Sequence, residues 1–208
     1  MLESLMREIN LYAQKKRETN EGNTSSRMKY MHDITMPELL KYLCVIIAMG
    51  LSPRPSVSDY WSDEGYLDNR WFRDLFTLKR FEAIHSSILH CGAPDAAGVQ
   101  KVQPFVAQMV ASFQANFYPF EGVSIDEMVI GWKGRFKHKT YNAKKPKKHH
   151  IKTYGLCDSA TGYVYDILCY FGDETAVNDG LQDKSSAVKV FDTLLTHLGP
   201  GHHVYADR

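Results

Sequence analysis

The spacing of apolar residues changes near the middle of the chain, from a helical period to an alternating, strand-like one. Residues 1–18 are amphipathic and rich in charge, which predicts a first helix. Thr35 and Glu38 have the spacing of a capping box, with a proline between them in the first turn, so a second helix is predicted from here to Gly50. The prolines that follow end it.

Three more helical segments are predicted before the pattern changes. A short one begins at Ser56, and Thr77 caps a longer one over residues 78–90. The third begins at Pro104 and covers residues 104–117. Residues 18–33 are polar and contain Gly, Asn and Ser, so we interpret them as a linker or loose arm. The aromatic residues between the helices are predicted to form a helical core: Tyr60, Trp61, Trp71, Phe72 and Phe76.

The second half has the residue types of strands. Three runs rich in β-branched and aromatic residues cover residues 123–132, 149–158 and 163–172, and turn residues bound each of them. A helix with apolar residues on one face follows at 185–198, and residues 202–207 form a fourth strand. This β-β-β-α-β order is the layout of an RNase H-like half-domain, in which the first and fourth strands pair. The fold class predicted for the chain is α+β.

Two aspartates occupy related places in that layout. Asp126 lies inside the first predicted strand, and Asp207 ends the fourth. If those strands pair, the two carboxylates converge. The alternative is that Asp126 is a strand carboxylate paired with a nearby lysine and Asp207 is a polar strand end. Glu127 alternates to the other face of the strand, so we expect it to be exposed or in a salt bridge, and an Asx turn is expected at Asp158.

Composition indicates an ordinary globular protein. The 208 residues are 44% hydrophobic and 24% charged, enough for one core or for a core with a helical annex. No segment has the form of an export signal, and the longest apolar run is too short to span a bilayer. The four cysteines, Cys44, Cys91, Cys157 and Cys169, lack metal-binding spacing and are expected to be free, mostly buried thiols.

The chain has a formal net charge of +1, but many of its basic residues are concentrated in one stretch. Between Met128 and Cys157 there are nine basic residues and no acid: Lys133, Arg135, Lys137, Lys139, Lys144, Lys145, Lys147, Lys148 and Lys152. Trp132, Phe136 and Tyr141 lie among them and can stack on bases. We predict a loop that lies along DNA phosphates. A solvated connection and a nuclear localisation signal in the KKPKK run are the alternatives.

The remaining polar residues carry little further signal. The pairs His149-His150 and His202-His203 lie on predicted strands, where neighbouring side chains point to opposite faces and cannot readily share one ion. We interpret them as residues of strand starts. Phosphate-binding glycine loops, serine nucleophile elbows and cysteine–histidine pairs are absent from the sequence, so a small-molecule substrate is not expected.

Several blocks of sequence resemble the catalytic core of piggyBac-type transposases and the proteins derived from them. In order, the blocks are SIDE (124–127), KGR (133–135), a tyrosine followed by KPKK (145–148), IKTYGLCDS (151–159) and TGYV (161–164). Residues 34–62 and 78–90 resemble the helical dimerisation and DNA-binding region that precedes that core. The resemblance covers the chain from about Thr35 onward.

The resemblance implies metal-dependent DNA strand cleavage and transfer, carried out by three aspartates that hold two divalent ions, Mg²⁺ or Mn²⁺. Asp126 and Asp207 match the first two aspartates of that set and would be both metal ligands and catalytic residues. The third has no counterpart before Arg208, so we expect this chain to be inactive alone. The alternatives are a domesticated DNA- or protein-binding module without catalysis and a decayed gene fragment.

The same resemblance gives the expected organisation and partners. Residues 1–34 would be an N-terminal helix and linker, residues 35–120 the helical dimerisation and DNA-binding region, and residues 121–208 part of an RNase H-like catalytic domain. Double-stranded DNA, as transposon ends and TTAA targets, and a second copy of the chain are the implied partners. The implied location is the nucleus, and no membrane association is expected.

Overall fold

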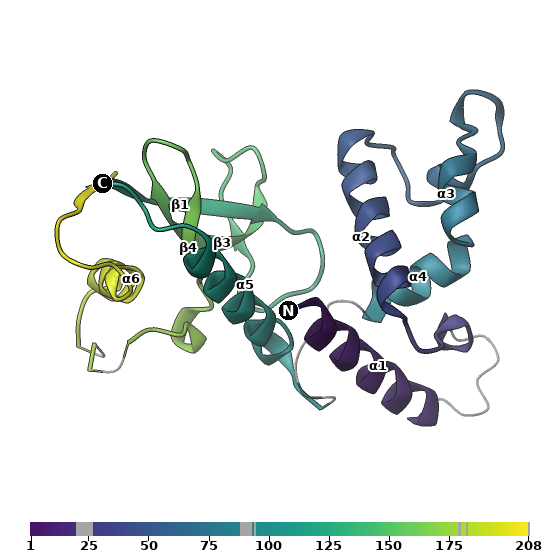
Figure 1. Cartoon of the computed structure of the whole chain (residues 1–208), viewed down its shortest axis with the longest axis horizontal. Coiled ribbons are helices and arrows are strands. Elements are labelled where there is room, and N and C mark those ends of the chain that lie inside the picture. Colours follow the sequence, from purple (N-terminus) through teal and green to yellow (C-terminus); the bar gives the residue numbers. More distant parts are fainter. Residues whose placement is uncertain (20–26, 88–92, 94, 179, 182, 208) are drawn as a thin grey trace. The chain divides into compact units, whose positions relative to one another are not determined.

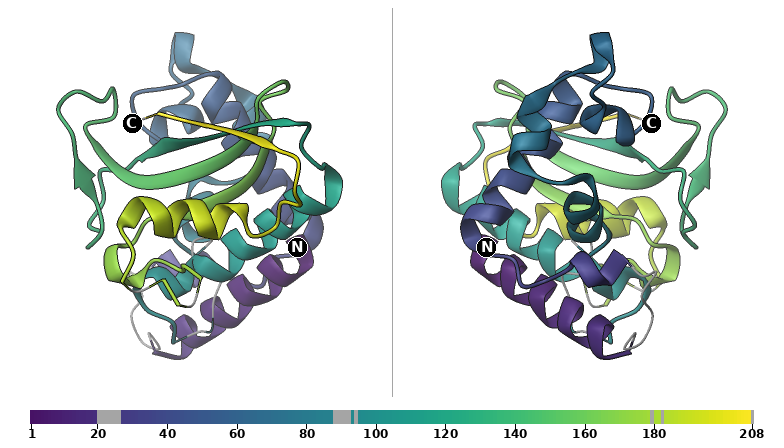
Figure 2. Two further views of the ribbon diagram at one scale, coloured as in Figure 1. Left: turned by 90° about the vertical axis from the view of Figure 1, so that its left-hand side faces the viewer. Right: turned by 90° about the vertical axis from the view of Figure 1, so that its right-hand side faces the viewer.

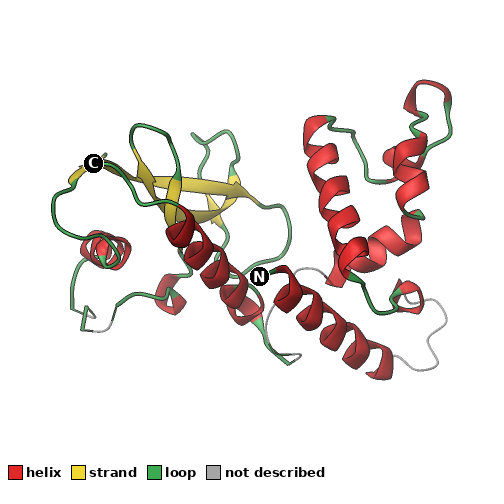
Figure 3. Cartoon of the chain, in the orientation of Figure 1, coloured by secondary structure: helices red, strands yellow, loops and turns green. Residues whose placement is uncertain are grey.

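A computed structural model of the chain describes residues 1–19, 27–87, 93, 95–178, 180–181 and 183–207 (Figure 1). It divides into two compact units, Met1–Phe105 and Val106–Arg208. Helices make up the first unit, whereas strands and two helices make up the second (Figure 3). The mixed α+β class predicted from the sequence is therefore observed.

The first unit contains the helices α1 (Leu2–Thr19), α2 (Met36–Leu51), α3 (Arg70–Leu75) and α4 (Leu78–Ser87), with short 3-10 turns η1 (Arg27–Tyr30), η2 (Ser58–Trp61), η3 (Gly65–Leu67) and η4 (Gly98–Lys101). The predicted cap of α2 is present, because the Thr35 hydroxyl accepts from the Glu38 amide at 3.4 Å. Thr77 caps α4 in the same way at the Arg80 amide. The predicted extension of α4 to residue 90 falls outside the described residues.

The segment after η1 corrects one prediction. Residues 18–33 were expected to form a linker or loose arm, but Met31 is buried in the helical core, as is Ile34 just beyond. The Asn10 side chain donates to the Ile34 carbonyl and accepts from its amide. Arg17 bonds the Met31 carbonyl. Two apolar residues of this region are therefore buried, and hydrogen bonds from α1 hold the backbone beside them. Residues 20–26 lie outside the described residues.

An ion pair joins α2 to α4 inside the helical unit. Arg80 is buried. Its guanidinium makes two 2.7 Å hydrogen bonds to the Glu38 carboxylate and also donates to the Tyr30 and His32 carbonyls. The Glu38 carboxylate also accepts from the Thr35 backbone amide, so the return half of the predicted capping box is present beside this pair. Burial raises the pKa of Glu38, but the bonds and charge of Arg80 outweigh it and hold that pKa below its ordinary value.

Replacing Arg80 by methionine is expected to lower the free energy of unfolding by about 3–5 kcal/mol, because the half-buried Glu38 carboxylate loses its counter-charge. Urea denaturation at neutral pH measures the loss. The matched change Arg73→Met removes a more exposed pair with Asp68 and should cost only about 0–1 kcal/mol.

The same pair predicts a pH dependence. Because the folded pKa of Glu38 is lowered, its contribution is full above the unfolded value and is lost as the pH falls through the folded value. Arg80→Met should remove that component. Equal losses in the two arginine variants would contradict this account of the pair.

The aromatic core of the helical unit is largely as predicted. Tyr60, Phe72 and Phe76 are buried, and Trp61 packs against the same cluster while donating to the Phe76 carbonyl at 2.7 Å. Trp71 is the exception, because it lies 44% exposed and meets Phe72 only edge-on. Cys44 is also exposed, against the prediction of mostly buried thiols, whereas Cys157 and Cys169 are half-buried; Cys91 lies outside the described residues.

In the second unit five strands form one sheet: β1 (Gly122–Gly131), β2 (Thr140–Tyr141), β3 (His149–Asp158), β4 (Val164–Cys169) and β5 (His203–Ala206). The order is β2-β3-β1-β5, with β4 also paired to β3. β1 runs antiparallel to β3 and parallel to β5, so the predicted pairing of the first and fourth long strands is confirmed. The short strand β2 was not predicted from the sequence.

Two helices, α5 (Gln103–Asn116) and α6 (Ser186–Leu195), accompany the sheet on one side, as Figure 2 shows. Val190 and Leu194 of α6 pack with Val123, Ile125 and Leu156 of the central strands. Residues 123 and 125 therefore face the core, and alternation turns Asp126 to the other face.

A buried aspartate fixes the turn between β3 and β4. Asp158 is fully buried and accepts from the Phe120 amide and from both the amide and the hydroxyl of Thr161. Burial raises the pKa of this carboxyl, but these hydrogen bonds outweigh it and lower the pKa below its ordinary value. The predicted Asx turn is therefore present, and Asp158 serves the fold.

Candidate functional site

The parallel pairing of β1 and β5 brings Asp126 and Asp207 together along the backbone. Ile125 of β1 is the Cα partner of Ala206 of β5. Asp126 and Asp207 are the next residues on these two neighbouring chains, which lie about 4.8 Å apart in a sheet. Both aspartates are exposed. The sequence separates them by eighty residues, and the sheet makes them neighbours.

The surroundings of Asp126 come from β3. Gly155 is its Cα partner there, and a side chain at that position would meet the Met128 methyl group at 2.6 Å. Met128 therefore lies across the glycine, on the same face as Asp126. The Cys157 thiol is close enough for the Asp126 charge to add to burial in raising the pKa of the thiol. One edge of the aspartate is thus lined by apolar and weakly polar groups.

Asp126 retains capacity to bind a cation. Its Oδ1 atom accepts from the Glu127 amide at 2.6 Å, and a carboxylate has further acceptor sites. Mg²⁺ and Mn²⁺ prefer carboxylate oxygens as ligands. The two exposed aspartates therefore supply the type of ligand that such an ion binds. Within the described residues, no group of three or more His, Cys, Asp or Glu side chains is arranged to hold a metal. The pair offers two protein ligands.

Glu127 is turned away from Asp126, as alternation predicts. Its carboxylate lies 3.6 Å from the Lys152 ammonium, which also lies over the rings of Tyr154 and Tyr170 at 4.8 and 5.8 Å. The predicted salt bridge of Glu127 is present. Lys152 was predicted from the sequence to contact DNA, but its ammonium group pairs with Glu127 of the neighbouring strand.

Residues 136–138, in the first half of the basic stretch, contact the segment that follows β4. Lys137 pairs with Glu174 at 2.7 Å, and the same carboxylate lies 3.3 Å from the His138 ring. Phe136 and His138 both pack against Phe171. Glu174 is 37 residues from Lys137, so the local sequence gave no signal of this pairing.

The second half of the stretch forms the tip of the β2–β3 hairpin. The Asn142 amide donates to the Lys148 carbonyl at 2.9 Å, and the Asn142 side chain accepts from the Lys144 amide. Tyr141 is 62% exposed and lies against the His149 ring at 4.9 Å. The hairpin therefore presents its lysines on an ordered turn beside an exposed aromatic ring.

The structure divides the nine predicted DNA contacts into two groups. Lys137 and Lys152 are in ion pairs, and Lys139 donates to the Gly134 carbonyl. Lys145 is half-buried. The five that are exposed and have no carboxylate partner among the described residues are Lys133, Arg135, Lys144, Lys147 and Lys148. We call these five the exposed cations of the basic stretch.

The histidine pairs lie at strand starts, as predicted. His150 is buried and its Nδ1 lies 2.8 Å from the Lys147 carbonyl, which fixes the base of the hairpin. His202 lies between the Phe120 carbonyl and the Tyr118 hydroxyl, and His203 lies 3.5 Å from Glu121. These contacts account for the pairs as structural residues.

A further acid, Asp166 on β4, is buried. Gln114 of α5 donates to it at 3.1 Å, and the His197 ring lies 3.6 Å away. Burial raises the pKa of this carboxyl above its ordinary value, against the smaller opposing effects of these partners. Asp166 lies on the helix-covered side and ties α5 and the segment after α6 to the sheet.

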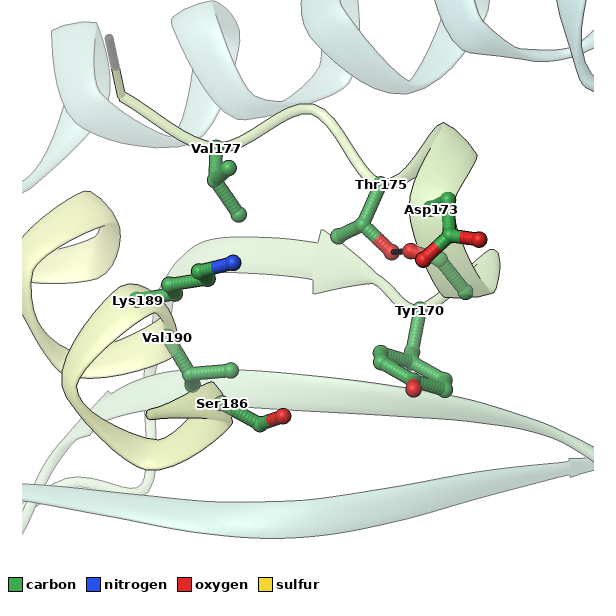
Figure 4. A pocket seen from close by; sticks show the side chains of 8 residues that line it. Tyr170, Asp173, Thr175, Val177, Ser186, Lys189 and Val190 are labelled. Atoms are coloured by element: carbon green, nitrogen blue, oxygen red, sulfur yellow. Dashed lines mark hydrogen bonds between the residues drawn. The ribbon is translucent and has the colours of Figure 1, made fainter. Parts of the chain in front are cut away.

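A pocket of about 390 Å³ lies between the end of β4 and the start of α6 (Figure 4). Lys189 points into it, and Tyr170, Asp173 and Ser186 supply its other polar groups. Thr175 is held by a 2.6 Å hydrogen bond to the Gly172 carbonyl. Because α6 borders this pocket, it belongs to the helix-covered side of the sheet and is separate from the Asp126 face.

Among the described helices, none has the length and apolar character to cross a bilayer.

Comparison with known proteins places this geometry in a family. The family model described as Transposase IS4 matches residues 1–208. Human PiggyBac transposable element-derived protein 5 is 25% identical over 186 residues, which are 87% of this chain and 34% of that protein. A solved piggyBac transposase, from a cryo-EM synaptic complex with hairpin DNA, superposes with a TM-score of 0.75 at 19% identity.

The superposition covers 98% of this chain and 42% of the piggyBac chain. This chain thus spans about a third to two fifths of the length of these two relatives. The structural likeness shows a shared fold, and the family model extends over every residue of the sequence. The chain belongs to the IS4 transposase family and is similar to piggyBac transposases and the proteins derived from them.

Proposed function

We propose that this chain is a piggyBac transposase-derived DNA-binding protein whose ancestral activity was metal-dependent strand cleavage and transfer. In this proposal its second unit is part of an RNase H-like catalytic domain, residues 121–208. Residues 35–120 are the helical dimerisation and DNA-binding region, which follows the N-terminal segment 1–34. The observation that carries the proposal is the parallel pairing of β1 and β5, with Asp126 and Asp207 next in register.

Asp126 and Asp207 would hold a Mg²⁺ or Mn²⁺ ion in this proposal. Such an ion, when bound, stabilises negative charge on the oxygens of a phosphodiester. The two carboxylates supply hard oxygen ligands, and Met128 and Cys157 limit access from one side. A two-metal site needs more carboxylates than these two. We therefore propose that residues 1–208 bind DNA without cutting it.

The exposed cations of the basic stretch are the proposed DNA contacts. Each is free to neutralise a phosphate, and such contacts bind without regard to base sequence. Tyr141 beside the hairpin lysines can stack on an unpaired base. The related transposase was solved in a complex with hairpin DNA. Duplex DNA and a second copy of this chain are the proposed partners, and the KKPKK run at the hairpin tip suits nuclear import.

A non-catalytic binding module is the second candidate. It is favoured by the small number of clustered carboxylates among the described residues. The first candidate holds a metal ion at Asp126 and Asp207, whereas the second is a DNA- or protein-binding module without a metal ion. Neither cuts DNA, so a supercoiled plasmid incubated with the chain and Mn²⁺ should stay supercoiled, and its conversion to nicked circles would contradict both candidates.

Salt titration tests DNA binding itself. Fluorescence anisotropy with a labelled duplex should show affinity falling steeply with salt, and the five exposed cations should contribute about −4.5 to the slope of log K against log salt. The reason is that each phosphate contact releases condensed counterions. Binding that is absent at low salt, or that is insensitive to salt, would contradict the proposal.

A further inference from the structure

The helical unit has an open groove of about 410 Å³ where η1 meets the starts of α2 and α4. Its apolar lining residues are Leu75 and Phe76. Its polar lining, which combines cationic, hydroxyl and carboxylate groups, is Lys29, Tyr30, His32, Glu38, Thr77 and Arg80. None of these residues belongs to the basic stretch of the second unit.

The charges of this groove do not cancel. Glu38, the acid in the lining, is already neutralised by its two hydrogen bonds to Arg80. Lys29 on η1 and Lys79 on α4 are both exposed, and neither has a carboxylate partner within the described part of the chain. The Lys29 ammonium therefore remains uncompensated in the groove, and the Lys79 ammonium adjoins the groove over the ring of the lining residue Tyr30.

Tyr30 brings the two lysines to one place. The Lys29 ammonium lies 5.0 Å from the centre of the Tyr30 ring, and the Lys79 ammonium lies 5.4 Å from it. Hydrogen bonding to Lys79, with a smaller effect of Lys29, lowers the pKa of the Tyr30 hydroxyl. Both cations thus converge on one phenol from different elements, although like charges repel. An anionic partner would relieve that repulsion.

We propose that this groove binds a backbone phosphate of duplex DNA through Lys29 and Lys79, with the Tyr30 hydroxyl between them. The proposal rests on the proposed DNA-binding function and adds a contact on the helical unit. An open groove with exposed ammonium groups suits a phosphodiester on a long polyanion, because each lysine is a mobile point charge. An enclosed small-molecule site would bury its ligand.

The test compares salt titrations of duplex binding for the 208-residue chain and for Lys29→Gln/Lys79→Gln. The double variant should make the slope of log K against log salt less negative by about 1.8, since two counterion-releasing contacts are lost. The variant Lys29→Arg/Lys79→Arg should keep the original slope. Both lysines are exposed, and thermal melting followed by circular dichroism checks that the variants fold.

Lys41→Gln/Arg70→Gln is the matched control, because it removes two exposed charges of the same unit away from the groove. Its slope should stay that of the unmodified chain. Equal changes in the groove and control variants, or no change in either, would overturn the groove proposal while DNA binding itself stands. A chain that does not bind the duplex at all would overturn the proposed function instead. Inorganic phosphate as competitor distinguishes a free-anion site, which it would block at low concentration.

Discussion

Replacing Lys144, Lys145, Lys147 and Lys148 by glutamine is expected to weaken duplex DNA binding by on the order of 10²- to 10³-fold near about 0.1 M salt. Three of these lysines are exposed at the tip of the β2–β3 hairpin, and the fourth is half-buried there. Because the turn is held by Asn142, glutamine substitutions remove charge and leave the hairpin backbone bonds in place. Anisotropy with a labelled duplex measures the loss.

The paired lysines provide the control. Lys137→Gln/Lys152→Gln removes two charges from the same stretch, but these charges are already balanced by Glu174 and Glu127. We expect a loss of less than about threefold. The loss of DNA affinity per positive charge removed should be smaller in this control than in the hairpin variant. An equal loss per charge would contradict the division of the basic stretch into paired and exposed cations.

Asp126→Asn and Asp207→Asn are each expected to weaken Mn²⁺ binding at least about tenfold, because either change removes a charged oxygen ligand from a site with few ligands. Water proton relaxation detects bound Mn²⁺ in solution. Asparagine keeps the size and one oxygen of aspartate, and both residues are exposed, so the fold should be retained.

Glu127→Gln is the neighbouring control, since Glu127 lies on the other face of β1 and pairs with Lys152. Its Mn²⁺ affinity should match that of the unmodified chain. If all three variants bind equally well, the metal is held elsewhere and Asp126 and Asp207 are ordinary surface carboxylates.

Much of the sheet could be predicted from the sequence because its strands alternate and its turns are marked. Val123 and Ile125 face the core while Asp126 turns outward, and Asp158 with Thr161 closes a turn as expected. The two-residue strand β2 was missed, since a run of that length has no periodicity. Its pairing with β3 gives the basic hairpin its order.

The pairing of charges could not be predicted, because partners come from distant segments. Glu174 neutralises Lys137 only after the chain has passed through β3 and β4. Likewise Glu38 completes the predicted local capping box, but the sequence gave no local signal of its ion pair with Arg80, which lies 42 residues away on α4. Lys29 and Lys79 lie too far apart in sequence to suggest a common groove.

In the proposed function, β1 and β5 bring Asp126 and Asp207 to one metal site. This site can be tested with crystals of the chain grown with Mn²⁺ and short duplex DNA and measured at a wavelength where manganese scatters anomalously. We predict an anomalous peak in contact with carboxylate oxygens of both aspartates, and its loss in Asp126→Asn. A map with Mn²⁺ bound only at other residues, or with the two carboxylates pointing apart and no peak between them, would contradict the account.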